Sequence, residues 1–538
     1  MKQVYLNLVK KTGMVLLVYL FVALTAGRSY AQLIYQPYSY QFYQKLNTDV
    51  YSTQTRLHTS LKPYLIGDSS SLRPIYDSLM QTHVDKKGRS WVYRELFQQH
   101  LIEDRTKKYT FYADFLPDLL IGREFTDKKN VSLNTRGYQI SGTIGANFFF
   151  YTSGYENQGK FANYETAYID KVGMIPGQAY NRSFLGNTDW SYSTALIGFT
   201  PNKNISIVLG EDKTFIGDGY RSVLLSDYAS NYPLLRLTFN LGKNVQYMAM
   251  WAYMEDQNAK QFNSFTNNRR KWGAFHYVDW NINNRASIGF FNALIAEEAN
   301  DVGKLHGFDI NYINPILFAS SLGPGGGAPD HTLVGFNGKY KVLDKTTVYS
   351  QILFDQGTST ASSNSKTAWQ LGFRGSDLFK ISRFNYLFEY NTAAPYTYSS
   401  QSPIVNYAEL SEPLAHPYGA NFRECLGILN YTLGKFDFQG QINYAKYGLN
   451  SATINYGKDI TLANNVNLPV TGGSTGQGLA TTLKYAEGTV AYLINPKYNL
   501  RIEIGGLLRQ EKNSQTDLKT SMITLGLRSS FRNLYHDF

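Results

Sequence analysis

Hydrophobic and polar residues alternate strictly along several stretches of the chain. The clearest stretch is KFDFQGQINYAK, residues 435–446. Its apolar positions are Phe436, Phe438, Ile442 and Tyr444, and its polar positions are Asp437, Gln439, Gln441 and Asn443. Because successive side chains of a β-strand point to opposite faces, this pattern predicts a strand with one apolar and one polar face.

Two further stretches, RFNYLFEYN (383–391) and NLRIEIGGLLR (499–509), alternate in the same way. Their apolar positions are Phe384, Tyr386, Phe388 and Tyr390 in the first and Leu500, Ile502, Ile504 and Leu508 in the second. The opposing positions are Asn385, Glu389, Asn391, Asn499, Arg501, Glu503 and Arg509. These faces are too polar for the dry core of a sandwich. They suit a wet lumen with lipid on the other side, which favours a transmembrane β-barrel.

Short and long connections alternate between the predicted strands. Tight links are expected at 200–204, 241–244, 282–285, 343–345, 433–435 and 495–497. Longer polar segments lie between them, at 213–232, 255–271, 357–365, 393–420, 448–482 and 510–519. Outer-membrane barrels have this asymmetry, with short periplasmic turns and long external loops.

The number of strands depends on one segment, Leu305–Ile313. It is one of nineteen strand-like segments between Tyr109 and Phe531, and it breaks the short–long order. Bacterial single-chain barrels have an even number of strands. If 297–330 is one external loop, eighteen strands remain. Sixteen or twenty are the alternatives, and twenty would need a strand at Ile316–Leu322, shorter than the roughly 9–11 residues of a span.

The end of the chain also reads as a barrel strand. In SMITLGLRSSF, the residues on one face are Ile523, Leu525, Leu527 and Phe531. The chain stops at Phe538. A terminal aromatic residue beside an amphipathic strand is common in substrates of the barrel-assembly machinery, which is therefore an expected partner.

Residues 1–31 have the features of a secretory signal peptide: a basic start, an apolar core at Met14–Ala26 and small residues before the expected cleavage point. Residues 32–105 show helical spacing, and we expect a periplasmic segment that caps or plugs the barrel, with a disordered tail as the alternative. Residues 106–538 are expected to form the barrel. The single cysteine, Cys425, is far from the expected cleavage point, so no lipid anchor is expected there.

Composition narrows the class of partner. The chain has 43 Tyr and 32 Phe, and no apolar run after the signal is long enough for a transmembrane helix. Four of its eleven excess positive charges lie in the signal, which leaves +7. This mild excess suits an acidic polysaccharide or lipopolysaccharide. It is not the dense basic patch of a nucleic-acid-binding protein, so no nucleic acid is expected as partner.

The stretch GEDKTFIGDGYRS, residues 210–222, concentrates charge and glycine. It fits neither a calcium loop nor a phosphate loop. Because it follows the short strand ISIVLG, we expect it at the external mouth of the barrel. There it is either a solvated, glycine-hinged loop or a ligand contact through Asp212, Asp218, Tyr220 and Arg221.

Aromatic residues add to this candidate site. Trp190, Tyr396 and Tyr398 are expected in or beside external loops, where they would stack on sugar rings or anchor at the membrane interface. The eight histidines show no metal spacing, and no serine-nucleophile motif is present. We therefore predict no catalytic residue, no metal and no cofactor.

Several segments carry a resemblance to a known family. Residues 187–227, HGFDINYINPILF, YSYQFYQKLN and WVYRELFQQHLI resemble the gliding-motility outer-membrane proteins of the RemB family and, more distantly, the Wzi capsule-assembly proteins. The resemblance covers most of the chain after the signal. It implies an eighteen-stranded outer-membrane barrel that binds surface polysaccharide, capsule or slime, and helps to attach or assemble it.

Three functions are thus compared. A polysaccharide-binding outer-membrane protein in contact with lipid and lipopolysaccharide is favoured, a porin-like transport pore is the alternative, and an enzyme is the weakest. The apolar loop 297–330 is expected to fold inward and plug the barrel, with Gly323–Gly327 as its flexible return.

Overall fold

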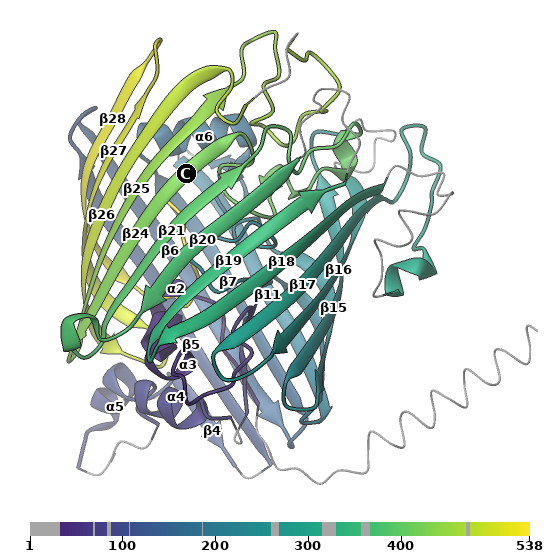
Figure 1. Cartoon of the computed structure of the whole chain (residues 1–538). Helices are drawn as coiled ribbons and strands as arrows, with labels where there is room; N and C mark the ends of the chain where they lie inside the picture. Colours follow the sequence, from purple (N-terminus) through teal and green to yellow (C-terminus); the bar gives the residue numbers. More distant parts are fainter. Residues whose placement is uncertain are drawn as a thin grey trace, which may run out of the picture.

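The computed structural model describes residues 33–67, 70–82, 88–106, 108–184, 187–259, 268–314, 330–356, 366–469 and 474–538. Eighteen antiparallel strands form a closed barrel (Figure 1), because the last strand pairs with the first. The strands are β5 (Tyr109–Glu124), β6 (Lys129–Ile144), β7 (Phe148–Lys160), β11 (Asn187–Asn202), β12 (Ile205–Asp212), β14 (Tyr232–Leu241), β15 (Val245–Asp256), β16 (Arg269–Asn281), β17 (Ala286–Glu297), β18 (Asp330–Leu343), β19 (Thr346–Asp355), β20 (Thr367–Gly375), β21 (Phe384–Ala393), β24 (Phe422–Leu433), β25 (Phe436–Leu449), β26 (Leu479–Asn495), β27 (Leu500–Lys512) and β28 (Asp517–Arg528). The predicted class and strand number are confirmed.

The wall shows the predicted alternation. On β25 the side chains of Ile442 and Tyr444 are exposed on the outer face, whereas Gln441 and Asn443 are buried inside. The same holds for most of β21 and β27. Leu500 is an exception, since it starts β27 and packs in an apolar cluster with Leu116, Tyr155 and Tyr498. The alternation of outward and inward side chains breaks at Leu500, because the pairing of β26 with β27 shifts register next to the turn.

The two ends of the barrel differ as predicted. The expected tight links all lie at one end, between β11 and β12, β14 and β15, β16 and β17, β18 and β19, β24 and β25, and β26 and β27. The long connections β7–β11, β12–β14, β21–β24 and β25–β26 lie at the other end. The predicted long segment 510–519 is wrong, because β27 and β28 extend into it and leave only residues 513–516 between them, and 357–365 lies outside the described residues. This asymmetry defines the periplasmic end by its short turns and the external end by its long loops. Among the described residues, no helix is long and apolar enough to cross a membrane.

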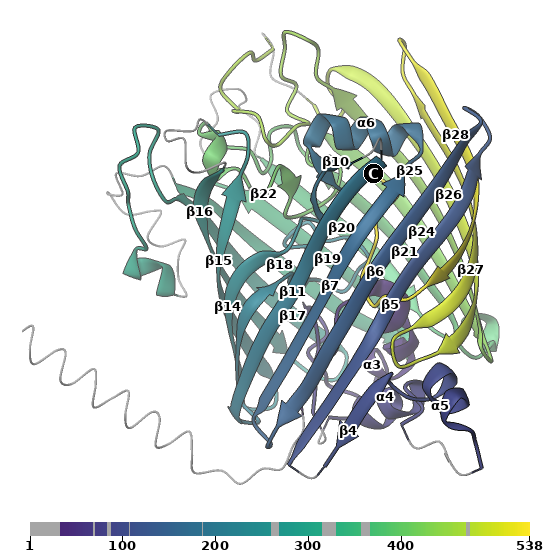
Figure 2. The ribbon, with the colours of Figure 1, turned by 180° about the vertical axis from the view of Figure 1, so that it is seen from behind.

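The N-terminal segment occupies the periplasmic end of the lumen. Its elements are β1 (Ile34–Tyr35), α2 (Tyr40–Tyr43), η1 (Gln44–Leu46), α3 (Asn47–Val50), β2 (Leu61–Lys62), β3 (Leu65–Ile66), α4 (Arg73–Leu79), α5 (Trp91–Phe97) and β4 (Ile102–Arg105). Figures 1 and 2 show α2 and α3 within the barrel and α4 and α5 below its rim. Tyr38, Phe42 and Leu46 belong to one buried cluster with Phe215 of the barrel interior.

Segments from the external loops enter the lumen from the opposite end. Between β12 and β14, the chain runs inward and forms β13 (Phe215–Ile216), which pairs with β2 of the N-terminal segment. Between β21 and β24 lie η4 (Pro403–Val405), β22 (Ala408–Glu409) and β23 (Glu412–Pro413). Between β7 and β11 lie α6 (Asn163–Val172), β8 (Met174–Ile175), β9 (Ala179–Tyr180) and β10 (Arg182–Phe184), and α6 lies across the external mouth (Figure 2).

The C-terminal tail, residues 529–538, also fills the lumen. After β28 ends, the chain turns into the barrel and runs toward α6 (Figure 1). Phe531 packs on Phe42 with ring centroids 5.3 Å apart, and Phe538 packs on Tyr168 at 4.5 Å. The prediction that Phe531 continues the strand face of Ile523, Leu525 and Leu527 is therefore wrong. The strand pattern ends at Arg528, and the following residues pair with interior groups rather than with a neighbouring strand.

The predicted plug loop does not enter the barrel over its described part. Residues 298–314, with η2 (Ile310–Ile313), lie outside the wall in both views (Figures 1 and 2). Val302 and Ile310 are 84% and 72% exposed. The loop packs on outward-facing tryptophans instead: the Trp251 Nε1–H donates to the Tyr312 carbonyl over 2.8 Å. Leu305–Ile313 is not a strand either, and Gly323–Gly327 lie outside the described residues.

Candidate functional site

The seven residues predicted as ligand contacts are buried. They are Trp190, Asp212, Asp218, Tyr220, Arg221, Tyr396 and Tyr398, and none is more than 9% exposed. The prediction that GEDKTFIGDGYRS sits at the external mouth is therefore wrong. These residues lie inside the barrel because their charged groups pair with the lumen wall, the N-terminal segment and the tail. The spacing of the residues in the sequence does not reveal these partners.

Asp218 and Gly219 explain the inward course of this stretch. The Tyr51 hydroxyl donates to the Asp218 carboxylate over 3.0 Å, and Thr59 also bonds it. Burial would raise the pKa of Asp218, but the nearby cations Lys339 and Lys62 outweigh it and lower the pKa to about 2. A Cβ at Gly219 would lie 2.1 Å from Oε1 of Glu389, so only glycine admits this carboxylate beside the loop backbone.

Arg221 joins the loop to the C-terminal tail. Its Nη2 lies 2.7 Å from Oδ2 of Asp537 and 3.3 Å from Oε1 of Glu424. The guanidinium also lies over the rings of Tyr220 and Tyr535, 5.0 and 5.8 Å from their centroids. This group is enclosed by the protein and holds interior segments together.

The two predicted tyrosines hold loops to one another. The Tyr398 hydroxyl donates to the Val223 carbonyl over 2.7 Å, and the Tyr396 hydroxyl donates to the Asn455 carbonyl over 2.8 Å. Asp212 accepts from Arg532 of the tail over 2.6 Å. Trp190 is the one of these seven residues that lines the larger cavity described next.

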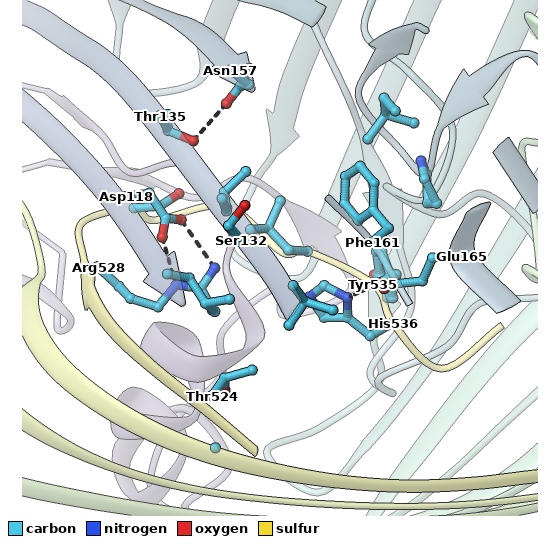
Figure 3. Close-up of a pocket in the computed structure, with 18 of the residues that line it drawn as sticks. Asp118, Ser132, Thr135, Asn157, Phe161, Glu165, Thr524, Arg528, Tyr535 and His536 are labelled. Carbon is cyan, nitrogen blue, oxygen red and sulfur yellow. Dashed lines mark hydrogen bonds and ion pairs between the residues drawn. The ribbon is translucent and has the colours of Figure 1, made fainter. Parts of the chain in front are cut away.

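This cavity has a volume of about 100 Å³ and lies between the wall and the interior segments (Figure 3). Its wall comes from β5, β6, β7, β11, β26, β27 and β28, and therefore from both sides of the closing seam. Its inner side comes from the α6 loop and the tail. The polar and aromatic residues that line it are Asp118, Ser132, Thr135, Tyr155, Asn157, Lys160, Phe161, Glu165, Gln178, Trp190, Tyr192, Glu487, Thr489, Glu503, Thr524, Arg528, Ser530, Tyr535 and His536.

One end of the cavity is a compact ionic group at the seam. The Arg528 guanidinium donates to both oxygens of Asp118, over 2.8 and 3.0 Å, as Figure 3 shows. It also donates to Glu503 over 3.1 Å, and Glu503 accepts a second hydrogen bond from Arg501 Nε over 2.8 Å. Two cations thus balance two carboxylates, so this end carries little net charge.

The middle of the cavity is acidic. His536 Nδ1 lies 2.8 Å from Oε1 of Glu165, on α6, and Glu487 on the wall is close enough to act on the imidazole electrostatically. Burial would lower the pKa of His536, but the hydrogen bond and charge of Glu165, with the charge of Glu487, outweigh it. The pKa is therefore raised above its ordinary value. Even with His536 protonated, two carboxylates face one cation.

Aromatic and amide groups line the part nearer the external rim. The Phe161 and Trp190 ring centroids are 5.5 Å apart, and Lys160 beside them is exposed at the end of β7. The Asn157 amide is fixed by bonds to Thr135 and to the Trp190 carbonyl. An apolar pocket with a few fixed polar groups is the usual form of a small-ligand site. Within the described residues, no cluster of three metal-ligating side chains is present.

Sequence reasoning missed most of this cavity. The strand alternation predicted that Glu503 faces the lumen. Glu487, on the neighbouring strand β26, also lines the lumen side of the wall. The sequence gives no sign that Glu165 of a loop helix and His536 of the tail would meet between these strands, 371 residues apart.

A closed barrel with an apolar outer face, short turns at one end and long loops at the other is an outer-membrane protein. Among solved structures, the chain is similar to Wzi, a carbohydrate-binding β-barrel of the outer membrane involved in group 1 capsule assembly in Escherichia coli. The identity is 13%, the match covers 93% of this chain and 99% of that chain, and the TM-score is 0.53.

The barrels of Pseudomonas aeruginosa OprD and OccK2 overlap less well. OprD has a TM-score of 0.42 at 10% identity over 78% of this chain and 94% of its own. OccK2, solved with glucuronate, has a TM-score of 0.43 at 9% identity over 78% and 98%. No family model and no curated protein sequence matches the chain. The resemblance to gliding-motility proteins therefore stays a prediction.

Proposed function

We propose that this outer-membrane barrel binds surface polysaccharide, capsule or slime, and supports its attachment or assembly, in connection with gliding motility. The observation that carries the proposal is a lumen filled by the chain's own segments, with a cavity of aromatic, amide and carboxylate groups left between these segments and the wall. Aromatic faces and fixed hydrogen-bonding groups are suited to sugar rings and their hydroxyls. The structural likeness to Wzi supports the same class of fold.

The filled lumen argues against the alternative, a passive pore. Eighteen strands enclose enough space for a water-filled channel. Here the N-terminal segment and the loop with β13 meet as a paired sheet inside the barrel, and the C-terminal tail runs beside them. A ligand at the external rim would meet this interior rather than pass through it.

The proposal includes further partners and parts of the chain. Residues 1–31 would direct export, residues 32–105 would face the periplasm from the lower end of the barrel, and residues 106–538 would form the barrel and its interior. Lipid and lipopolysaccharide would surround the wall, and the barrel-assembly machinery would insert it. We assign no catalytic role.

The test is retention of polysaccharide on cells. A deletion strain is complemented with the full-length protein, with Thr489→Phe, which fills the cavity, or with Val490→Phe, a matched change on the outer face of the same strand. We expect the deletion strain and the Thr489→Phe strain to shed polysaccharide and the other two to retain it. Normal retention by the deletion strain, with the barrel verified to be missing, would contradict the proposal.

A further inference from the structure

We propose that the cavity beside the closing seam takes a neutral or amino-bearing sugar residue and rejects a uronic acid. This inference rests on the proposed function and names the chemistry of its ligand. It departs from the acidic polysaccharide expected from the net charge of the chain, because the cavity and the chain as a whole differ in sign.

Apart from Lys160, which is exposed near the rim, the charges in and beside the cavity fall into two groups. At the seam, Arg528 and Arg501 balance Asp118 and Glu503 through bonds of 2.8 to 3.1 Å. These groups are already paired, so a ligand gains little from them. The unpaired charge inside the cavity lies in its middle, where the carboxylates of Glu165 and Glu487 face the single imidazole of His536.

Glu487 is the group best placed to meet a ligand. Its Oε2 accepts the Tyr485 hydroxyl over 2.8 Å, whereas Oε1 has no hydrogen-bond partner in the described part of the chain. An acceptor that faces a cavity is completed by a ligand hydroxyl or ammonium group. A bond between a carboxylate and a charged or polar donor is stronger than one between neutral groups.

Possible hydrogen-bond donors line the same cavity. The side chain of His536 is 35% exposed, and its Nδ1 is held by Glu165, so Nε2 is left for the cavity. Thr489 and Thr524 line the wall on the two strands that flank Gly505. Thr524 is labelled in Figure 3. Two hydroxyls, one imidazole and one carboxylate match the alternating donors and acceptors of a sugar edge.

Size limits what can enter. A cavity of about 100 Å³ has room for several water molecules, and therefore for one terminal sugar residue or one of its substituents rather than a run of residues. Phe161 and Trp190 near the rim supply an apolar side for the ring face. A uronic carboxylate would enter beside Glu165 and Glu487, where like charges in a poorly hydrated site repel.

The experiment measures binding of the full-length barrel in detergent to three sets of oligosaccharides of equal length: glucosamine, glucose and glucuronate oligomers. We expect affinity in that order. Glu487→Gln keeps the size of the side chain but removes its charge, and should weaken glucosamine binding at least about tenfold. Glu511→Gln, a lumen-facing change outside the cavity, should leave it unchanged.

Thr489→Phe provides the second variant, because it blocks the cavity without altering charge and should abolish glucosamine binding. Preference for glucuronate, or glucosamine binding that neither Glu487→Gln nor Thr489→Phe weakens, would overturn this inference and leave the proposed function standing. Failure to bind any of the three sets, and the polysaccharide of the producing cell as well, would overturn both.

Discussion

Arg221 is a charged side chain whose function follows from its burial. It lies between Asp537 and Glu424, with three tyrosine rings around it. Taking one partner from a buried ionic group leaves the others uncompensated in a poorly solvated place, which costs several kcal/mol. This residue therefore stabilises the interior.

We expect Arg221→Ala to lower the free energy of unfolding by about 3–5 kcal/mol, because two buried carboxylates lose their cation. Urea unfolding of the barrel in lipid vesicles, followed by tryptophan fluorescence, measures this. Arg182→Ala is the control, since the side chains of Arg182 and its partner Glu156 are 55% and 58% exposed. Its effect should stay below about 1 kcal/mol. Equal effects of the two changes would contradict the assignment.

The His536–Glu165 pair makes docking of the tail depend on pH. The folded-state pKa of His536 is raised above its unfolded value of about 6.5. Its stabilising contribution is therefore complete below about pH 6.5 and is lost as pH rises through the folded pKa. Besides Glu165, the groups that act on it are Glu487, which raises the pKa, and Arg528, which lowers it.

We expect carboxypeptidase to remove Phe538 faster at pH 9 than at pH 6, after correction with a free peptide of the tail sequence. His536→Gln should abolish this difference, because its side chain does not titrate. A pH dependence that survives the substitution would show that another group controls the tail.

At this scale the sequence predicted which residues are unusual but not what they do. The spacing of GEDKTFIGDGYRS identified a dense set of charged residues, and the structure shows that they matter. Their roles could not be derived because Arg221 and Asp537 are 316 residues apart. Trp190 is the predicted residue that lines the cavity, and Glu165 and His536 had no local pattern to reveal them.

Among the elements, the interior segments matter most for function. The N-terminal segment, the loop with β13, the loop with η4 and the tail meet inside the barrel, where β2 pairs with β13 and Tyr40 N–H donates to Asn533 over 2.7 Å. The plug is thus composite. The sequence favoured the external loop 297–330 as the plug, but its described part, residues 298–314, packs outside the wall near Trp251 and Trp272.

We expect the full-length barrel to conduct little current in planar bilayers and a variant lacking residues 33–66 to form channels, because that segment fills the periplasmic half of the lumen. Replacing Leu305–Ile313 by a Gly/Ser linker of equal length is the control and should leave conductance unchanged. Channels from the linker variant, or none from the deletion, would show that the loop outside the wall is the true plug.

The barrel as a whole was predictable because its wall obeys local rules. Most strands show their two faces through alternation, and most turns show their end of the barrel through their length. Eighteen strands could therefore be preferred over sixteen or twenty without knowledge of distant contacts. The interior obeys no such rule. A segment enters the lumen when its charges find partners on distant strands, as Asp218 does with Tyr51, and these pairings are not encoded in any short stretch.

The whole molecule is therefore a filled barrel with a cavity of about 100 Å³ between its wall and its interior segments. The most direct test is a glycan array probed with the purified full-length barrel, with Thr489→Phe as the blocked form and Val490→Phe as the control. The expected result is binding to a defined set of surface glycans that Val490→Phe retains and Thr489→Phe loses. Absence of glycan binding by the full-length barrel, together with large and stable channels in bilayers, would contradict the central claim and make it a transport pore.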